Sequence, residues 1–173
     1  MFCEAGELGE RADVSWRVLP VVYDEAALRL EEAIDELKPE VVIALGICDE
    51  PCYRIERVAH NLDDTEVPDN RAEVRRSLRI IEDGPDRYEA PYSHVELARR
   101  LEEKGLPWRF SDSAGGFLCN HVFYHLCRLA ASPRRAVHAA TFLHVPPLAE
   151  GDELGGLIEA IGCAVEAALD SVS

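Results

Sequence analysis

Val41-Val42-Ile43-Ala44-Leu45-Gly46 is a continuous apolar run, preceded by Lys38-Pro39 and followed by a polar loop. A short apolar run of this kind is typical of a strand that is buried on both faces of a parallel sheet. The segment before it, residues 24–37, has apolar side chains at helical spacing, with Asp24 as the expected cap. A helix that leads directly into a buried strand indicates an α/β chain.

Helices and strands are expected to alternate along the rest of the chain. Glycine, proline and capping residues delimit further helices at residues 93–104, 117–130 and 154–169. Strands are expected at residues 17–22, 108–111 and 136–144, and residues 61–90 form a long loop of the kind that is often functional. We therefore predict one domain over residues 1–173, folded as a three-layer α/β/α sandwich with a mainly parallel twisted sheet.

The composition argues against several classes of protein. A chain of 173 residues with 47% hydrophobic and 29% charged residues is an ordinary globular sequence, long enough for a core of its own. Its net charge of −15 opposes binding to the phosphates of nucleic acid. No apolar run approaches the roughly 20 residues that a membrane helix requires, and the first residues do not resemble a signal peptide. We expect a cytoplasmic protein.

The cysteines do not form a metal-binding or disulfide pattern. No pair has the C-x-x-C spacing, and a structural disulfide is not expected in the cytoplasm. Most of them are expected to be small buried hydrophobic residues. The chain has six: Cys3, Cys48, Cys52, Cys119, Cys127 and Cys163.

One cysteine has a setting that suggests chemistry. Cys119 lies in Ser111-Asp112-Ser113-Ala114-Gly115-Gly116-Phe117-Leu118-Cys119-Asn120, after an expected strand and a glycine turn, where a helix begins. The free N–H groups and the positive dipole end of a helix start favour a thiolate, and can stabilise an oxyanion. The alternative is a buried helical cysteine that packs like alanine.

A histidine and a glutamate are candidates for the other members of a catalytic triad. His144 ends an expected strand before Pro146, and active groups of open α/β sheets collect at the carboxyl ends of strands. Glu56 is the candidate for orienting the imidazole of His144. The alternative is a surface glutamate that pairs with Arg54 or Arg57, and periodicity leaves both interpretations open.

Four motifs follow one another along the chain, at residues 17–23, 55–64 with 67–70, 113–120 and 142–146. In this order they resemble the pyroglutamyl peptidase (pyrrolidone carboxyl peptidase) family of cysteine peptidases. The resemblance implies that Cys119 is the nucleophile, His144 the base and Glu56 the third member. It also implies removal of an N-terminal pyroglutamate (5-oxoproline) from peptides, no metal or other cofactor, and often a homotetramer.

Two segments depart from the family pattern. The family begins with a strand and a Gly-, Phe- and Pro-bearing loop that helps to hold the pyroglutamyl ring, and nothing before Arg17 resembles it. The family's glycine–arginine turn is replaced by residues 47–52. Two other hypotheses follow: an inactive or repurposed member that acts as a binding or oligomeric protein, and a thiol hydrolase with a different acyl specificity.

Two further groups of polar residues are expected to be structural. His121 and His125 lie one helical turn apart, but no third metal ligand accompanies them. A second group partly resembles a calcium loop, although Pro68 and the lack of the invariant glycine favour turn and capping roles. Its members are Asp63, Asp64, Asp69 and Asn70.

Overall fold

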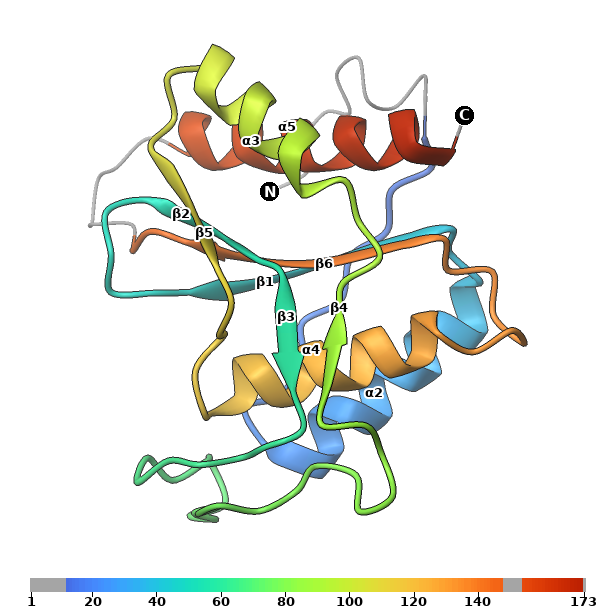
Figure 1. Ribbon diagram of the computed structural model, residues 1–173, viewed down its shortest axis with the longest axis vertical. Coiled ribbons are helices and arrows are strands. Elements are labelled where there is room, and N and C mark those ends of the chain that lie inside the picture. Colours follow the sequence, from blue (N-terminus) through green and yellow to red (C-terminus); the bar gives the residue numbers. More distant parts are fainter. Residues whose placement is uncertain (1–11, 148–153, 173) are drawn as a thin grey trace.

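A four-stranded sheet forms the middle layer of the structure (Figure 1). The computed structural model describes residues 12–147 and 154–172. Strands β1 and β6 are parallel, β2 and β5 are parallel, and β2 runs antiparallel to β6, so the sheet is mixed but mostly parallel. The strand order is β1 (Val41–Ile47), β6 (Ala139–Val145), β2 (Tyr53–Glu56) and β5 (Trp108–Ser111).

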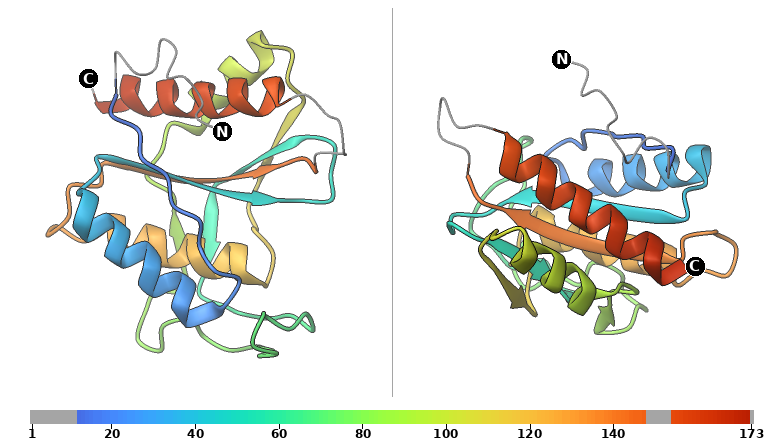
Figure 2. Two further views of the ribbon diagram at one scale, coloured as in Figure 1. Left: turned by 180° about the vertical axis from the view of Figure 1, so that it is seen from behind. Right: turned by 90° about the horizontal axis from the view of Figure 1, so that it is seen from above.

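Helices cover both faces of this sheet, which confirms the predicted α/β/α sandwich (Figures 1 and 2). One face packs against α2 (Tyr23–Leu37) and α4 (Leu118–Ala130), and the other against α3 (His94–Glu103) and α5 (Gly155–Val172). In the described part of the chain, no helix combines the length and apolar character that crossing a bilayer requires.

The side chains of β6 alternate between the two cores. Ala140 and Phe142 belong to the core under α2 and α4, whereas Leu143 and Val145 belong to the core under α3 and α5. The period of two in a strand places His144 on the α4 side, where its ring lies 4.9 Å from that of Phe142.

Burial on both faces, which the apolar run predicts for β1, is instead a property of β6. All of β6 is buried, while the side chains of β1 are half-buried or exposed. Among the described strands β1 pairs only with β6, so it lies at the edge of the sheet.

The expected strand at residues 17–22 is wrong. This segment has no regular structure before a bend that leads into α2, and Val18 is 82% exposed. Leu19 packs against the α2–α4 core, and Figure 2 shows the segment running from the α5 layer past the sheet to α2. A high β-propensity does not by itself provide a hydrogen-bonding partner, and none of the described strands pairs with residues 17–22. The family's first strand concerns residues before Arg17, most of which lie outside the described residues.

The cap of α2 comes from the long loop and not from Asp24. The helix begins after Val22, and the carboxylate of Asp69 accepts the N–H of Tyr23 at 3.3 Å. Its other oxygen accepts the N–H groups of Arg71 and Glu73 at 2.8 and 2.9 Å. Burial pushes the pKa of Asp69 upward, but the bonds from Glu73, Arg71 and Tyr23 hold that pKa below its ordinary value. Asp69 is a turn and capping residue, as expected.

Short β pairings hold residues 61–90 in place. The segment follows β3 (Val58–His60) and contains β4 (Arg87–Glu89). Strands β3 and β4 form a small antiparallel sheet that contacts α4. An isolated bridge between Asp63 and Leu78 closes the loop on itself.

Replacement of Asp69 should loosen both the loop and α2. We expect Asp69→Ala to lower the free energy of unfolding by about 2 kcal/mol, because three backbone N–H groups lose their acceptor. Asp69→Asn, which keeps an acceptor oxygen, should lose less. Urea unfolding monitored by circular dichroism measures both values.

The pH dependence of that loss provides a check on its cause. Because the folded-state pKa of Asp69 is lowered, its charge stabilises the fold above its ordinary pKa of 3.8, and this contribution is lost as the pH falls further. The difference between the wild type and Asp69→Ala should therefore shrink on acidification below about pH 4. A difference that does not change with pH would count against a charged cap.

Candidate active site

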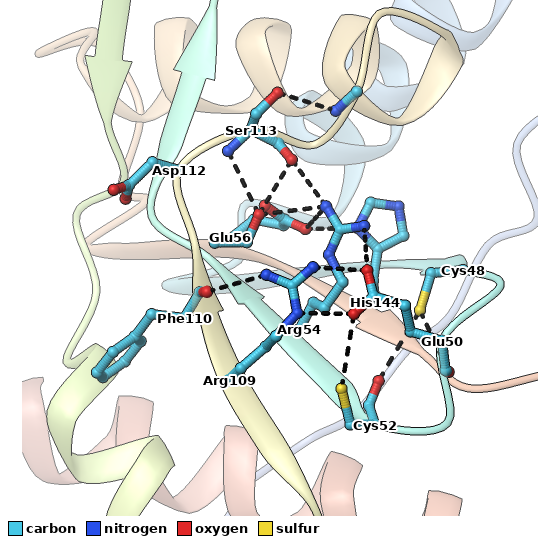
Figure 3. A network of polar contacts seen from close by, with 12 residues as sticks. Cys48, Glu50, Cys52, Arg54, Glu56, Arg109, Phe110, Asp112, Ser113 and His144 are labelled. Atoms are coloured by element: carbon cyan, nitrogen blue, oxygen red, sulfur yellow. Dashed lines mark hydrogen bonds and ion pairs between the residues drawn. The ribbon is translucent and has the colours of Figure 1, made fainter.

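Glu56 and His144 form a buried hydrogen-bonded pair across two neighbouring strands (Figure 3). The N–H at Nδ1 of His144 donates to Oε1 of Glu56 at 2.7 Å. Glu56 is fully buried and His144 is 4% exposed. The alternative of a surface glutamate is therefore wrong, and Arg57 pairs with Asp112 instead.

Cys119 lies beside this pair on the same face of the sheet. Gly46 of β1 is the register partner of His144. A methyl group on Gly46 would lie 2.9 Å from Sγ of Cys119, so the sulfur packs against the β1 backbone. The fold thus brings the three predicted residues together under the start of α4, while a direct contact between Cys119 and His144 stays a prediction.

Burial at Cys119 opposes the thiolate that the helix start is expected to favour. Burial raises the pKa of the Cys119 thiol to about 11, and the negative charge of Glu56 acts in the same direction. Arg54 and the backbone N–H of Cys119 itself oppose this shift but do not cancel it. This shift favours the neutral thiol, so that a base must take the proton of Cys119 before it can act as a nucleophile.

The site is not built at a common carboxyl edge of parallel strands. Because β2 runs antiparallel to β6, Glu56 at the carboxyl end of β2 pairs with Phe142 in the middle of β6. The short β2 also ends beside Ser111. This residue is the last of β5 and the first of the segment Ser111–Asn120, which carries Cys119. Glu56 therefore meets His144 on the sheet face that α4 covers and not at a shared strand end.

A backbone contact braces the glycine turn before Cys119. The N–H of Asp64 donates to the carbonyl of Gly116 at 2.9 Å. A methyl group on Gly116 would lie 2.1 Å from the carbonyl oxygen of Asp64, so the two segments approach closely enough to require glycine. The preceding Gly115 has a φ of +87°, which also favours glycine. The long loop thereby holds the turn that presents the cysteine.

Asn120 is a site residue that sequence reasoning missed. Its buried side-chain amide accepts the N–H of His60 at 3.0 Å and donates to the carbonyls of His60 and Leu62, both at 2.9 Å. These bonds lock the residue next to Cys119 onto the end of β3. The available signal was an amide directly after the candidate nucleophile, in a helix that is otherwise mostly apolar.

Arg54 is a second missed site residue. Its Nη2 lies 2.9 Å from Oε1 of Glu56 and 2.8 Å from the carbonyl oxygen of Ser113 (Figure 3). The sequence suggested that Arg54 could pair with a Glu56 on the surface. The two residues do pair, but the carboxylate of Glu56 is buried.

The histidines of α4 have other contacts within the described part of the fold. Nδ1 of His121 donates to Asp63 at 2.9 Å, and burial lowers the pKa of His125 to about 4. Within the described ranges, no group of three or more His, Cys, Asp or Glu side chains is placed to hold a metal ion. The cysteines of the described residues are all free thiols, as expected.

A mostly parallel α/β sandwich with a buried Glu–His pair next to a cysteine defines a candidate cysteine hydrolase. The model of the pyroglutamyl peptidase family matches residues 4–156. The chain belongs to the pyroglutamyl peptidase family.

Individual relatives agree with this assignment. Pyrrolidone-carboxylate peptidase of Bacillus cytotoxicus is 36% identical over 133 residues, which are 76% of this chain and 61% of the relative. The enzyme of the same name from Enterobacter sp. is 38% identical over 135 residues, 78% of this chain and 62% of the relative. The chain thus spans less than two thirds of the length of these curated relatives.

The fold is that of solved members of the family. A mutant pyrrolidone carboxyl peptidase from Pyrococcus furiosus superposes with a TM-score of 0.86 at 30% identity, covering 91% of this chain and 82% of the other. The pyroglutamyl peptidase I of Bacillus amyloliquefaciens gives a TM-score of 0.82 at 26% identity, covering 87% and 76%.

The neutral state of Cys119 should be visible in its alkylation kinetics. Because its pKa is about 11, the thiolate fraction and hence the rate with iodoacetamide should rise about tenfold per pH unit between about pH 7 and 10. N-acetylcysteine in parallel should level off above its ordinary pKa of about 8.5. Mass spectrometry of the Cys119 peptide gives the rate, and a plateau near neutrality would instead indicate a thiolate–imidazolium ion pair.

Asn120 is expected to fix the start of α4 as well as to stabilise the fold. Asn120→Ala should lower the free energy of unfolding by about 2 kcal/mol, because it leaves buried backbone groups unpaired. It should also speed the alkylation of Cys119 severalfold, because the cysteine becomes less buried. Asn61→Ala is the matched control, since its amide also makes three bonds to backbone, with Ile81 and Gly84. Equal alkylation changes in the two variants would contradict a local role of Asn120.

Proposed function

We propose that this protein removes an N-terminal pyroglutamyl residue from peptides, with Cys119 as nucleophile, His144 as base and Glu56 as the group that orients His144. The observation that carries the proposal is the buried bond between Glu56 and His144, with Cys119 packed beside it, in a member of this family. A buried carboxylate–imidazole pair next to a thiol is the arrangement that activates a cysteine for acyl transfer.

The neutral thiol determines the first step. His144 donates from Nδ1 to Glu56, so its Nε2 is the nitrogen that can take the proton of Cys119. The sulfur then attacks the carbonyl carbon, and the C–N bond breaks as the leaving amine receives the proton from His144. Water, deprotonated by the same nitrogen, hydrolyses the thioester to 5-oxoproline and the free thiol.

The environment suits this reaction. Backbone N–H groups at the start of α4 are candidates to stabilise the developing oxyanion. Glu56 stays fixed by buried contacts, so the imidazolium that forms during the reaction has a carboxylate partner throughout. The lactam ring lacks a free amine, which calls for a mainly apolar pocket with a few hydrogen bonds. Downstream specificity is proposed to be loose.

The wider parts of the proposal come from the sequence. The resemblance to the family suggests peptide substrates with an N-terminal pyroglutamate, no cofactor, and a homo-oligomer with a tetramer as the first candidate. The charge and the lack of a long apolar run suggest a cytoplasmic protein that binds neither nucleic acid nor membrane. The chain's native mass in solution, from light scattering, tests the assembly.

A thiol hydrolase with a different acyl group is the second candidate. It is favoured by residues 47–52, which replace the family's glycine–arginine turn. In this turn the carboxylate of Glu50 accepts two bonds from Arg109, at 2.6 and 2.7 Å, and lies 3.3 Å from Arg54. A turn held by this different set of contacts can shape a different acyl pocket while leaving the thiol chemistry unchanged.

Hydrolysis of a pyroglutamyl-linked fluorogenic amide tests the activity. Cys119→Ser and His144→Ala should each lower kcat/KM by several orders of magnitude, because each removes a member of one catalytic unit. Cys163→Ala is the control: its cysteine is buried on the opposite face of the sheet and should not affect the rate. Full activity of Cys119→Ser would refute the proposed nucleophile. Cleavage of other N-acyl amides, with the pyroglutamyl amide untouched, would support the second candidate.

A further inference from the structure

Arg54 connects two parts of the site that are far apart in the sequence. From β2 its guanidinium reaches Glu56 on the same strand and the carbonyl oxygen of Ser113 in the nucleophile turn. It also lies 3.2 Å from Oγ of Ser111. The planar fork of arginine suits such a bridge, because its donors are fixed relative to one another.

The burial of Glu56 makes this bridge necessary. The side chain of Glu56 is fully buried, and its second oxygen, Oε2, has no hydrogen-bond partner. A buried carboxylate is stable only with a positive or strongly donating partner, and the ring of His144 provides a single N–H to it. Arg54, with a side chain that is 17% exposed, provides the positive charge at 2.9 Å.

We propose that Arg54 is a positioning residue for the candidate triad: it keeps Glu56 oriented toward His144, and it fixes the turn that carries Cys119. The expected effects on kcat and on the pH–rate profile rest on the proposed function. The expected effect on the alkylation of Cys119 does not. The positive charge of Arg54 also opposes the rise in the pKa of the Cys119 thiol.

Other titratable groups surround Glu56 and remain in place when Arg54 is changed. They come from the neighbouring elements: His144 of β6, Cys119 of α4, His94 of α3 and Arg109 of β5.

The chain contains a second arrangement of the same kind, between the long loop and α4. Oδ2 of Asp63 is shared by Nδ1 of His121 at 2.9 Å and Nη1 of Arg75 at 3.3 Å, and its other oxygen is also buried without a partner. Asp63 is fully buried, and the Arg75 side chain is 12% exposed. Arg75 is therefore the matched control for Arg54, with similar burial and partners but no contact with the candidate site.

The test compares Arg54→Gln, Arg54→Lys and Arg75→Gln. Each folded variant is characterised by thermal unfolding, by the pH–rate profile for a pyroglutamyl amide, and by the alkylation rate of Cys119 at fixed pH. Arg54→Gln should lower kcat by roughly ten- to a hundredfold with KM changed far less, because the loss is one of geometry. The acidic limb of its profile should move to higher pH, because the site loses a positive charge that opposes protonation.

The lysine variant separates charge from geometry. Arg54→Lys keeps the charge but not the fork, so the acidic limb should stay in place while kcat falls at least about threefold. Alkylation of Cys119 should slow severalfold in Arg54→Gln. Arg75→Gln should lower the melting temperature and leave both the profile and the alkylation rate unchanged.

Several results would overturn the inference. They are a folded Arg54→Gln with wild-type kinetics and alkylation, or Arg75→Gln with the same changes as Arg54→Gln. If Arg54→Gln does not fold, an Arg54→Lys variant with wild-type kcat and alkylation overturns it. A wild-type chain that cleaves no pyroglutamyl amide refutes the proposed function instead, and the alkylation rates then decide the role of Arg54 by themselves.

Discussion

One carboxylate oxygen, Oε1 of Glu56, receives both the ring N–H of His144 and the guanidinium of Arg54. Because Glu56 is fully buried, these two partners replace the hydration that the carboxylate loses on folding. The pairing constrains the sheet as well: β2 and β6 must lie side by side, in the register that sets Arg54 opposite His144. The orientation of the imidazole and the position of the nucleophile turn both follow from this one buried group.

The long loop supports the other half of the site. It caps α2 through Asp69 and meets the glycine turn through Asp64. Asn120 adds the link from α4 to the end of β3. A segment with little regular structure is thereby held by buried side-chain and backbone hydrogen bonds. This arrangement explains how a mostly irregular loop can hold a helix start in a defined position.

The pKa of the Cys119 thiol depends on two opposing effects, which are burial and the position at a helix start. A helix N-terminus contributes at most about 1–2 kcal/mol toward an anion, whereas removal of a thiolate from water costs more. Glu56, which is needed to orient His144, adds its own repulsion. The chemistry proposed here therefore depends on proton transfer to His144 at the moment of reaction and not on a preformed thiolate.

The sequence by itself determined the alternation of helices and strands, the helix start at Cys119 and the candidate roles of His144 and Glu56. These features depend on residues close in the chain: apolar periodicity, a Gly-Gly turn and a proline after a strand. Only the tertiary structure decided the antiparallel direction of β2, the absence of a strand at residues 17–22, the cap from Asp69 and the bridge from Arg54. It also decided how far Cys119 is buried, which raises the pKa of its thiol. Strand direction, distant hydrogen bonds and loss of hydration depend on which segments meet in space, and local propensity carries no information about that.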